Sequence, residues 1–478
     1  MMAWTVMAAI ALLHPPDASL TAVLKIIQKH GGSAYCTIAQ SNGLRGLVTT
    51  RAADPGDVLM EVPLECCFSD FGAEMPVTIE PPAFSVDQTW DSQLACTVLT
   101  HRHSSPLLST WPKEPPPQPM NCDPRELALV CDESISRKVR KQRARCEQLY
   151  EVAKRDAEAA GCPEAVGSAQ DFADALTYVW SRSFLINSNI RPKVLGSRRM
   201  LCPVLDLANH DEKPTAAFRF MPTWGEREAT RGGVIRLHAT RRLDEGEAIT
   251  IRYTSFTSDY AARYYGFVPA HNERCDELLM PLCSVLDCYS DTRTGASCWT
   301  EQTCESLRHA AGSSLYVLHK LHPSAPSRLL LRKLRSLLLS QPDDYDQEEE
   351  EVSERVEGVF AEGEEDVAIG ALRAVATAAE AESLRLRKAA AEADTAAAND
   401  VLSAAAELLI KLRDSRIRLL SELAVSMREV AAQFEQPGEA DAARKKLEAL
   451  LADAEDPKSM DLSTILKVRE AAAEGASM

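Results

Sequence analysis

The pattern of apolar and polar positions predicts short strands at two distant places in the chain. Residues 58–63 and 248–253 are rich in apolar and β-branched residues, and each segment follows a turn sequence containing Pro or Gly, at residues 54–57 and 243–247. A third strand is expected to open at the turn within residues 41–48. We therefore expect a β-rich part built from segments that lie far apart in the sequence.

Longer segments with apolar residues at every third or fourth position predict helices. In the first half of the chain they are residues 19–29, 90–100, 137–155 and 171–186, and a short helix is expected to begin after Asp123, at Pro124. After residue 270 the pattern is almost wholly helical, at residues 306–321, 327–339, 440–453 and 462–473, and in long helices within residues 371–433.

One apolar stretch ends abruptly on polar residues. Residues 203–208 would bury well except for Asp206, and Asn209 and His210 follow at once. A buried Asn-His pair must find hydrogen-bond partners or cost roughly 1–3 kcal/mol. Tyr253 ends the strand-like segment about forty residues later. Each of these residues alone fits an ordinary core, but their combination indicates a site.

Composition narrows the classes of function. The chain has 478 residues, enough for two or three domains, and a net charge of -17 that argues against a nucleic-acid-binding surface spread over the whole chain. Its 14 cysteines include no Cys-x-x-Cys pair, so we expect no metal site and no disulfide framework. Residues 343–366 hold 13 acids and one Arg, the composition of a solvated linker.

The polar residues belong to three ordered motifs that resemble the carboxy-terminal half of a SET domain. The closer likeness is to the branch that includes the RuBisCO large-subunit lysine methyltransferase and the actin histidine methyltransferase. That branch carries D-x-x-N-H, here residues 206–210, then G-E-x-hydrophobic-x-hydrophobic-x-Y, here residues 246–253, and then Y-G-F, here residues 265–267. All three match in order and spacing.

Further likenesses lie upstream. Residues 181–184 match the S-R-x-F segment that precedes the Asn-His motif in the family, and the Pro-rich connection at Trp111 loosely resembles a motif of the family's inserted helical segment. The family's cofactor loop usually has two glycines flanking one residue. Here Leu44 stands where the first glycine is expected, Gly43 lies one place earlier, and Gly46 matches the second.

The resemblance implies S-adenosylmethionine as the cofactor and a role for each matched residue. Tyr253 would be the catalytic residue and would also contact the cofactor. The other residues implied in cofactor binding are Arg45, Gly46, Leu47, Arg182, Asn209, His210 and Phe267. Phe184 and Tyr265 would line the substrate channel, and Asp206 would lie near its mouth.

The resemblance also implies an architecture. We expect an α+β protein with a β-rich SET fold of small sheets and knotted-type threading, a helical insert, and an all-helical C-terminal lobe. The expected parts are a lead-in at residues 1–40, N-terminal SET strands at 41–70, the insert at 71–195, the C-terminal SET core at 196–270, and a substrate-binding-like lobe at 271–478 with the acidic linker at 343–366.

The function implied is S-adenosylmethionine-dependent protein-lysine N-methylation. In many histone-directed SET enzymes a zinc-binding cysteine cluster follows the position of Phe267. No such cluster follows it here, so a non-histone substrate is favoured. Two alternatives stay open. One is a histidine methyltransferase, although Phe184 stands where that branch has Asn. The other is an inactive SET-like interaction protein, which the altered glycine loop favours.

Expectations about partners and compartment follow from the same observations. We expect a protein substrate, no nucleic acid, no membrane and a monomeric chain. The expected compartment is the cytoplasm or nucleus, with the plastid as an alternative.

Overall fold

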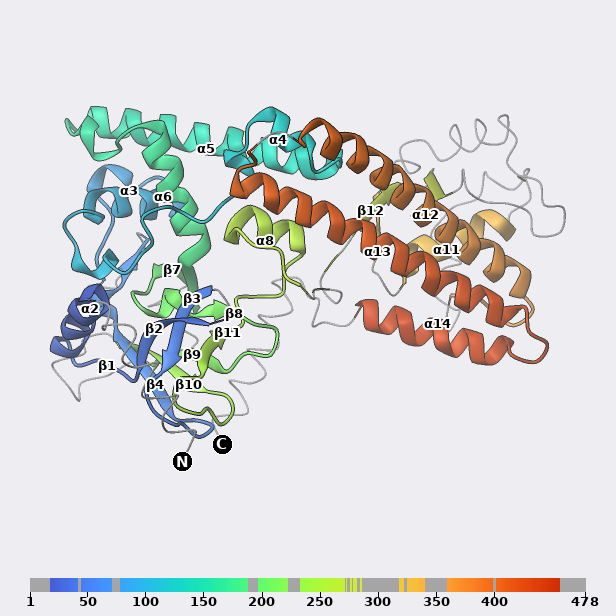
Figure 1. The fold of residues 1–478 in the computed structure, drawn as a ribbon, viewed down its shortest axis with the longest axis horizontal. Coiled ribbons are helices and arrows are strands. Elements are labelled where there is room, and N and C mark those ends of the chain that lie inside the picture. The colour runs from blue at the N-terminus through green and yellow to red at the C-terminus, as the bar shows by residue number, and fades with distance from the viewer. Residues whose placement is uncertain are drawn as a thin grey trace. The chain divides into compact units, whose positions relative to one another are not determined.

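The computed structural model describes residues 18–41, 44–70, 78–187, 197–221, 233–270, 272, 276, 278–281, 284–285, 318–321, 325–339, 359–398 and 401–455. These residues form two compact units (Figure 1). The first takes its described residues from 1–120 and 140–254, and the second from 121–139 and 255–472. The division after Thr254 precedes the predicted end of the SET core at residue 270.

A four-stranded antiparallel sheet lies in the first unit. Its order is β1-β4-β10-β9. Apolar side chains of β4 at Leu59, Met60 and Val62 are fully buried, while Glu61 lies opposite Arg236 of β10 and forms an ion pair with it at 2.6 Å. The strand predicted for residues 58–63 is thus confirmed, and it is largely buried. The bounds are β1 (Ser33–Ala34), β4 (Val58–Pro63), β9 (Ala216–Met221) and β10 (Val234–Ala239).

A second sheet, of order β2-β3-β11-β8, brings the two halves of the predicted motif together. Its strands are β2 (Cys36–Ser41), β3 (Leu44–Thr49), β8 (Asn209–His210) and β11 (Ala248–Ile251). β11 pairs antiparallel with β3 and parallel with β8, where Thr250 lies opposite Asn209 and Ile251 opposite His210. The Asn-His motif therefore runs beside the strand that leads to Tyr253.

A third, smaller sheet of order β5-β7-β6 and the helices complete the first unit, with α3 in contact with β5 and α6 with β6. These elements are α2 (Ala18–Lys29), β5 (Phe68–Ser69), α3 (Trp90–His101), most of α5 (Glu133–Ala159), α6 (Ala169–Arg182), β6 (Ser183–Asn187) and β7 (Ser197–Leu201). Single 3-10 turns occur at Leu64–Cys66, Ala83–Ser85, Pro106–Leu108, Pro119–Asn121, Pro163–Ala165 and Leu205–Leu207.

The helix predicted for residues 171–186 ends four residues earlier, so that part of the prediction is wrong. Ser183 is extended, with φ -81° and ψ 141°, and it opens β6. Phe184 and the residues after it pair with β7, with Phe184 opposite Met200. The aromatic and branched residues after Ser183 favour a strand once a partner is present, and tertiary pairing decided between the two.

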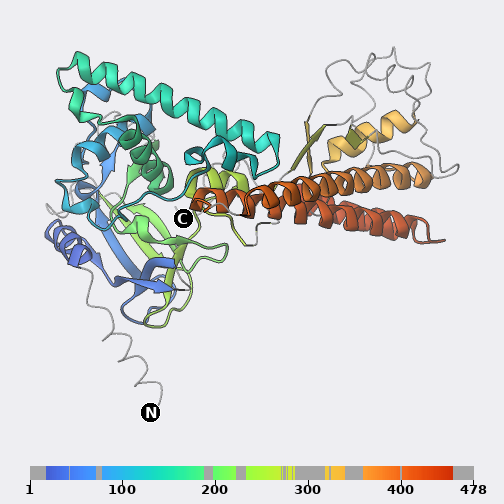
Figure 2. The same cartoon turned by 45° about the horizontal axis from the view of Figure 1, so that its top comes forward.

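The second unit is mainly helical. Helices α12 and α13 run side by side in both views, and α14 packs on α13 (Figures 1 and 2). Their buried Ala, Leu, Val and Ile residues form one core with α11. The bounds are α4 (Pro124–Ala128), α8 (Ser258–Tyr265), α11 (Arg328–Leu339), α12 (Glu365–Ala396), α13 (Ala404–Phe434) and α14 (Ala440–Glu455). The long helices predicted within residues 371–433 and the helix predicted for 327–339 are confirmed. Pro124 also begins α4, behind a complete capping box on Asp123.

Two predictions in this unit need correction. The helix predicted for residues 306–321 does not include its last four residues, because β13 (Leu318–Leu321) pairs antiparallel with β12 (Leu278–Pro281). The acidic linker lies outside the described residues up to 358, but its end is folded. Val359 and Phe360 are buried, and Glu364 pairs with Arg335. The helix predicted for residues 462–473 lies outside the described residues.

Candidate active site

Tyr253 lies just after β11 and its side chain is tied to the Asn-His motif. Its hydroxyl donates a hydrogen bond to the carbonyl oxygen of Ala208 at 2.9 Å, and its backbone N–H donates to Nδ1 of His210 at 3.3 Å. The rings of His210 and Tyr253 are 5.4 Å apart. Because a phenol has one proton, the bond to Ala208 leaves the oxygen lone pairs of Tyr253 as its remaining hydrogen-bonding capacity.

Burial controls the charge of both rings. It raises the pKa of Tyr253 to about 12, so the phenol is neutral at physiological pH. Burial also lowers the pKa of His210, against the opposing effect of the Glu212 carboxylate. A neutral His210 that accepts at Nδ1 carries its proton on Nε2, which lies 3.4 Å from Glu212. Tyr253 can therefore orient a reacting group but cannot serve as a base.

Asn209 meets the backbone of β3 at Gly46. Its side-chain Nδ2 donates to the carbonyl oxygen of Arg45 at 3.2 Å. A Cβ atom built on Gly46 would lie only 2.4 Å from that nitrogen, so any larger residue here would require the Asn209 side chain to move. Leu47 is buried and pairs with Ile249, whereas Leu44, at the start of β3, is 63% exposed. The structure brings the predicted residues Arg45, Gly46, Leu47 and Asn209 together. Gly43 lies outside the described residues.

Asp206 lies in a strained turn. Val204, just before it, is a fully buried β-branched residue with φ 71° and ψ -46°. Such a conformation costs of order 1–3 kcal/mol and persists only where the surroundings enforce it. The turn is closed by bonds from the Asp206 N–H to the Cys202 carbonyl at 3.1 Å and from the Leu207 N–H to the Val204 carbonyl at 3.0 Å. The strained residue therefore lies two positions before the carboxylate of Asp206.

The Asp206 carboxylate is buried among polar partners. Arg182 donates from Nη1 to the Asp206 backbone carbonyl at 3.0 Å, and the two side chains are 4.0 Å apart. Burial raises the pKa of Asp206 to about 6, although Arg182 and the indole N–H of Trp111 both oppose this. Within the described part of the chain, neither Oδ1 of Asp206 nor Nε of Arg182 has a hydrogen-bond partner. The cluster therefore keeps one acceptor and one donor unused.

Phe184 lies on β6, opposite Met200 of β7. It extends from β6 and meets Phe218 of β9 edge-on, with ring centroids 5.1 Å apart. It is half-buried and presents only carbon.

Tyr265 and Phe267 belong to the second unit. They lie at the end of α8, where Gly266 takes the left-handed conformation at φ 76° that closes the helix. Their rings form a cluster with Phe256, whose centroid lies 5.4 Å from Tyr265 and 6.0 Å from Phe267. Their predicted roles beside Tyr253 stay predictions.

One residue without a predicted role joins the Asp206 cluster. The indole N–H of Trp111 donates to Oδ2 of Asp206 at 2.5 Å, across 95 positions of sequence. Its place in a Pro-rich connection gives no local sign of this contact. Only the pairing of distant segments reveals it.

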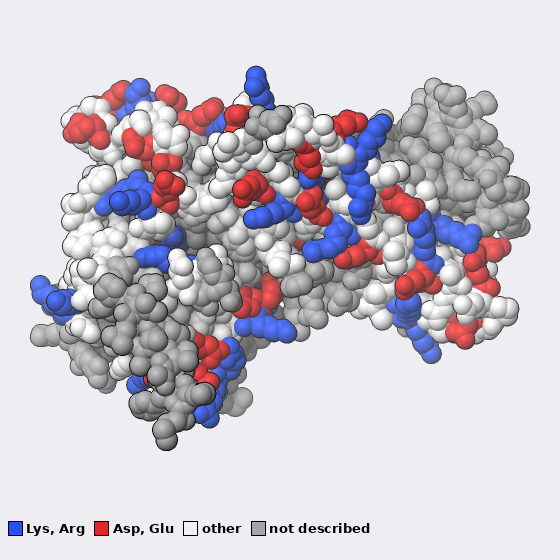
Figure 3. Space-filling view, in the orientation of Figure 1, with Lys and Arg blue, Asp and Glu red and all other residues white. Residues whose placement is uncertain are grey.

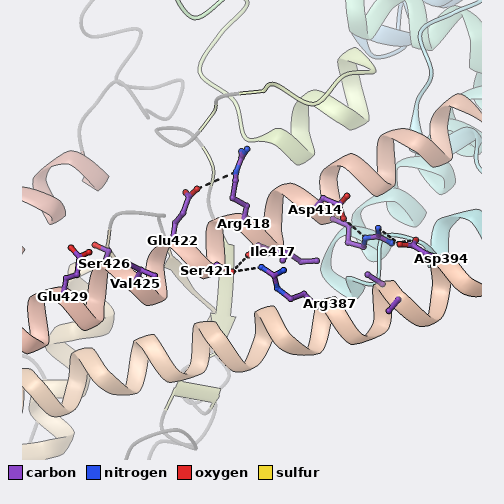
Figure 4. A pocket seen from close by; sticks show the side chains of 13 residues that line it. Arg387, Asp394, Asp414, Ile417, Arg418, Ser421, Glu422, Val425, Ser426 and Glu429 are labelled. Atoms are coloured by element: carbon purple, nitrogen blue, oxygen red, sulfur yellow. Dashed lines mark hydrogen bonds and ion pairs between the residues drawn. The ribbon is translucent and has the colours of Figure 1, made fainter.

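A separate hollow of about 830 Å³ lies along α12 and α13 in the second unit (Figure 4). Its apolar part is formed by Ala390, Ile417 and Val425, and its rim is charged. Arg413 forms ion pairs with Asp394 and Asp414 there. Basic and acidic side chains are interspersed over these helices in Figure 3. None of the predicted site residues lines this groove.

The described residues hold neither a metal cluster nor a membrane-spanning helix. No group of three or more His, Cys, Asp or Glu side chains is placed to hold a metal ion. No helix there has both the length and the hydropathy required to traverse a bilayer.

Comparison with solved structures shows which fold this is. The crystal structure of the SET domain of LSMT bound to lysine and AdoHcy matches with a TM-score of 0.58 and 13% identity, over 94% of this chain and 99% of that chain. Rubisco LSMT bound to sinefungin and monomethyllysine matches with a TM-score of 0.52 and 14% identity, over 94% and 99%. Rubisco LSMT bound to AdoMet matches at 0.51 and 14%, over 92% and 98%.

No family model and no curated protein matches the chain. The structural matches confirm the predicted SET fold and its likeness to the RuBisCO methyltransferase branch. The fold is the SET fold, with a helical C-terminal region.

Proposed function

We propose that this SET-fold chain is an S-adenosylmethionine-dependent protein-lysine N-methyltransferase that acts on a non-histone protein. The observation that carries the proposal is the parallel pairing of β8 with β11. That pairing sets the Ala208 carbonyl and His210 against the half-buried, neutral Tyr253 and holds Asn209 beside them on β8. This constellation is suited to methyl transfer, which needs an oriented amine and no strong base at the reacting atom.

The residues present fit the cofactor. S-adenosylmethionine has a carboxylate, an ammonium group and a sulfonium cation. The Nε–H of Arg182 is a buried donor without a partner among the described residues, and it is suited to a carboxylate. Asn209 lies close to the backbone of β3 at Gly46, so that strand can approach a ligand closely. We assign cofactor binding to Arg45, Gly46, Leu47, Arg182, Asn209 and His210. When bound, the cofactor supplies an electrophilic methyl group.

Tyr253 would act on the amine that receives this methyl group. Its hydroxyl donates to the carbonyl oxygen of Ala208. The phenol oxygen can then accept an N–H from the amine and weak C–H contacts from the methyl group. Orientation of this kind is worth several kcal/mol when it aligns the nitrogen for in-line attack. The amine must be neutral to attack, and burial of the kind that raises the pKa of Tyr253 would disfavour an ammonium in the same place.

Phe184 supports lysine as the target. Its ring and the ring of Phe218 form an apolar surface, which suits an alkyl amine and offers an imidazole no hydrogen bond. A histidine target would be favoured by a polar side chain at this position. An inactive interaction protein would not need the strain at Val204 or the buried charge of Asp206, both of which cost stability.

The test is Tyr253→Phe, which keeps the ring and removes one hydroxyl. We expect methyl transfer from labelled S-adenosylmethionine to a proteome extract to fall by roughly 10²–10³, the usual effect of losing one transition-state contact. The affinity for the donor, measured by calorimetry, should change little, because the hydroxyl acts mainly in the transition state.

Tyr150→Phe is the matched control. It also removes a tyrosine hydroxyl that faces a backbone carbonyl, that of Gly167 at 3.5 Å, on helix α5 of the same unit. Its rate should equal that of the unsubstituted chain. Equal rates in all three proteins would remove Tyr253 from the mechanism, and an unsubstituted chain that neither binds the donor nor transfers methyl groups would contradict the proposed function.

A further inference from the structure

Trp111 touches both members of the buried ion pair at Asp206. Its indole N–H binds Oδ2 of Asp206 at 2.5 Å, and the guanidinium of Arg182 lies 5.6 Å from the centre of its ring. An indole offers one donor and no acceptor, so this contact fixes the direction of the bond. Trp111 is therefore in contact with the anion through its edge and with the cation through its face.

The ring of Trp111 is itself held in place. It stacks on Tyr178 of α6 with ring centroids 5.1 Å apart, and the hydroxyl of Tyr178 donates to the carbonyl oxygen of Pro112 at 2.7 Å. Arg102 lies over the Tyr178 ring at 5.3 Å. Tyr178 is fully buried, so the stack anchors the half-exposed Trp111 to the core of the unit.

The two oxygens of Asp206 are consequently different. Oδ2 is occupied by the indole, whereas Oδ1 is buried and has no hydrogen-bond partner within the described residues. The side chain as a whole is only 5% exposed. A buried acceptor left unsatisfied costs free energy, so its retention points to a ligand that supplies the missing donor.

We propose that Trp111 is a positioning residue, which binds Oδ2 of Asp206 and so presents Oδ1 as the acceptor for an N–H group of the target residue in the substrate protein. This inference rests on the proposed methyltransferase function and deepens it, because it assigns to the Pro-rich connection of the insert a part in substrate recognition. Trp111 acts through Asp206 and not on the reacting atoms.

Binding of the target residue should depend on pH, because the hydrogen bond from the Trp111 indole is strongest when the Asp206 carboxylate is ionised. The charged and titratable groups that face this carboxylate are Arg182 from α6, Arg45 from β3, Cys202 before the turn and Tyr253 after β11. Arg182 and Arg45 favour the ionised form at every pH of interest. The pKa of Asp206 is about 6, so the carboxylate titrates just below neutrality.

The first arm of the test needs no activity. The chain has six tryptophans, and uniform labelling with 5-fluorotryptophan gives each its own fluorine resonance. We expect one resonance to titrate with a midpoint near pH 6 and to lose that titration in Asp206→Asn. Trp180, whose indole N–H binds Asp91 at 3.1 Å, is the matched control, and its resonance should not respond to Asp206→Asn.

The second arm measures binding of N-acetyl-L-lysine methylamide in the presence of S-adenosylhomocysteine, by calorimetry between pH 5 and 8.5. In Trp111→Phe the lost donor should raise the pKa of Asp206 by about one unit, because a hydrogen bond to a charged group is worth about that much. Affinity should then fall at every pH through the lost orientation, and about fivefold more at pH 6 than at pH 8.5 through the raised pKa. Trp180→Phe should keep the profile of the unsubstituted chain.

Each outcome decides one point. An Asp206-dependent titration in the first arm, with a raised acid midpoint in Trp111→Phe, supports the inference. A resonance that does not titrate, or a loss of affinity that is equal at every pH, overturns it, since a merely structural role would act at all pH values alike. The first arm uses only the unsubstituted chain and Asp206→Asn, so it can be read even if Trp111→Phe does not fold. If the titration is present but the unsubstituted chain does not bind the lysine probe, the proposed lysine specificity fails while the positioning of Asp206 stands.

Discussion

Replacing Gly46 by Ala is expected to disturb the second sheet through a single contact. The new Cβ would lie 2.4 Å from Nδ2 of Asn209, about 1 Å closer than ordinary contact allows, and 3.3 Å from Cγ. Gly46 is not among the residues with positive φ, so alanine causes no backbone strain at this position. Relief requires Asn209 to move, which breaks its bond to the Arg45 carbonyl.

The magnitude follows from three terms. Overpacking a fixed site costs about 1–3 kcal/mol, and the broken hydrogen bond adds about 1 kcal/mol. Against this, exchanging Gly for Ala reduces the entropy of the unfolded chain and stabilises by about 0.4–1 kcal/mol. The net loss of unfolding free energy in Gly46→Ala should be about 1–3.6 kcal/mol.

A double-mutant cycle isolates the contact. Asn209→Ala alone should cost about 1 kcal/mol, and Gly46→Ala with Asn209→Ala should cost no more than that, because the clashing carboxamide is gone. The assay is urea unfolding with unchanged slope across the variants. Calorimetry with S-adenosylmethionine should find binding lost in all three, since the proposed site needs Asn209 in its native position.

Gly56→Ala serves as the control. Gly56 has φ 92° and open space at its Cβ position, so alanine costs stability there through backbone strain alone. Its cost should add to that of Asn209→Ala. If the Gly46 and Asn209 variants were also additive, the steric reasoning would be refuted, and retained donor affinity in Asn209→Ala would remove Asn209 from the cofactor site.

Two further predictions concern the acidic segment and the product. Deleting residues 343–358 with a short Gly-Ser linker should leave the melting temperature nearly unchanged, whereas extending the deletion to 366 should cost more than about 3 kcal/mol, because it removes buried Phe360 and the Glu364 partner of Arg335. Calorimetric melting of both deletions checks this, and equal melting temperatures would contradict it. Mass spectrometry of methylated substrate should find methyl-lysine, as the apolar surface at Phe184 favours, and methyl-histidine as the main product would contradict the lysine assignment.

Local sequence patterns were sufficient for several elements. Apolar and β-branched residues after a turn predicted β4, the capping sequence at Asp123 and Pro124 predicted the start of α4, and the Ala- and Leu-rich stretch predicted α12 and α13. These features depend on residues a few positions apart, whose propensities act before any tertiary contact forms. The motif order around Tyr253 likewise predicted the SET fold, which the comparison with solved structures confirms.

Other features were decided only by distant segments. The strand at Ser183 formed because β7 offered a partner, and the strand at Leu318–Leu321 formed because β12 did so. The contact between Trp111 and Asp206 joins residues 95 positions apart, and the contact between Asn209 and the Arg45 carbonyl joins residues 164 positions apart. The sequence by itself determined where most of the regular structure begins and which residue types are available for a site. Tertiary structure decided which of them meet, because hydrogen bonds and packing between segments outweigh the roughly 1 kcal/mol differences in local propensity.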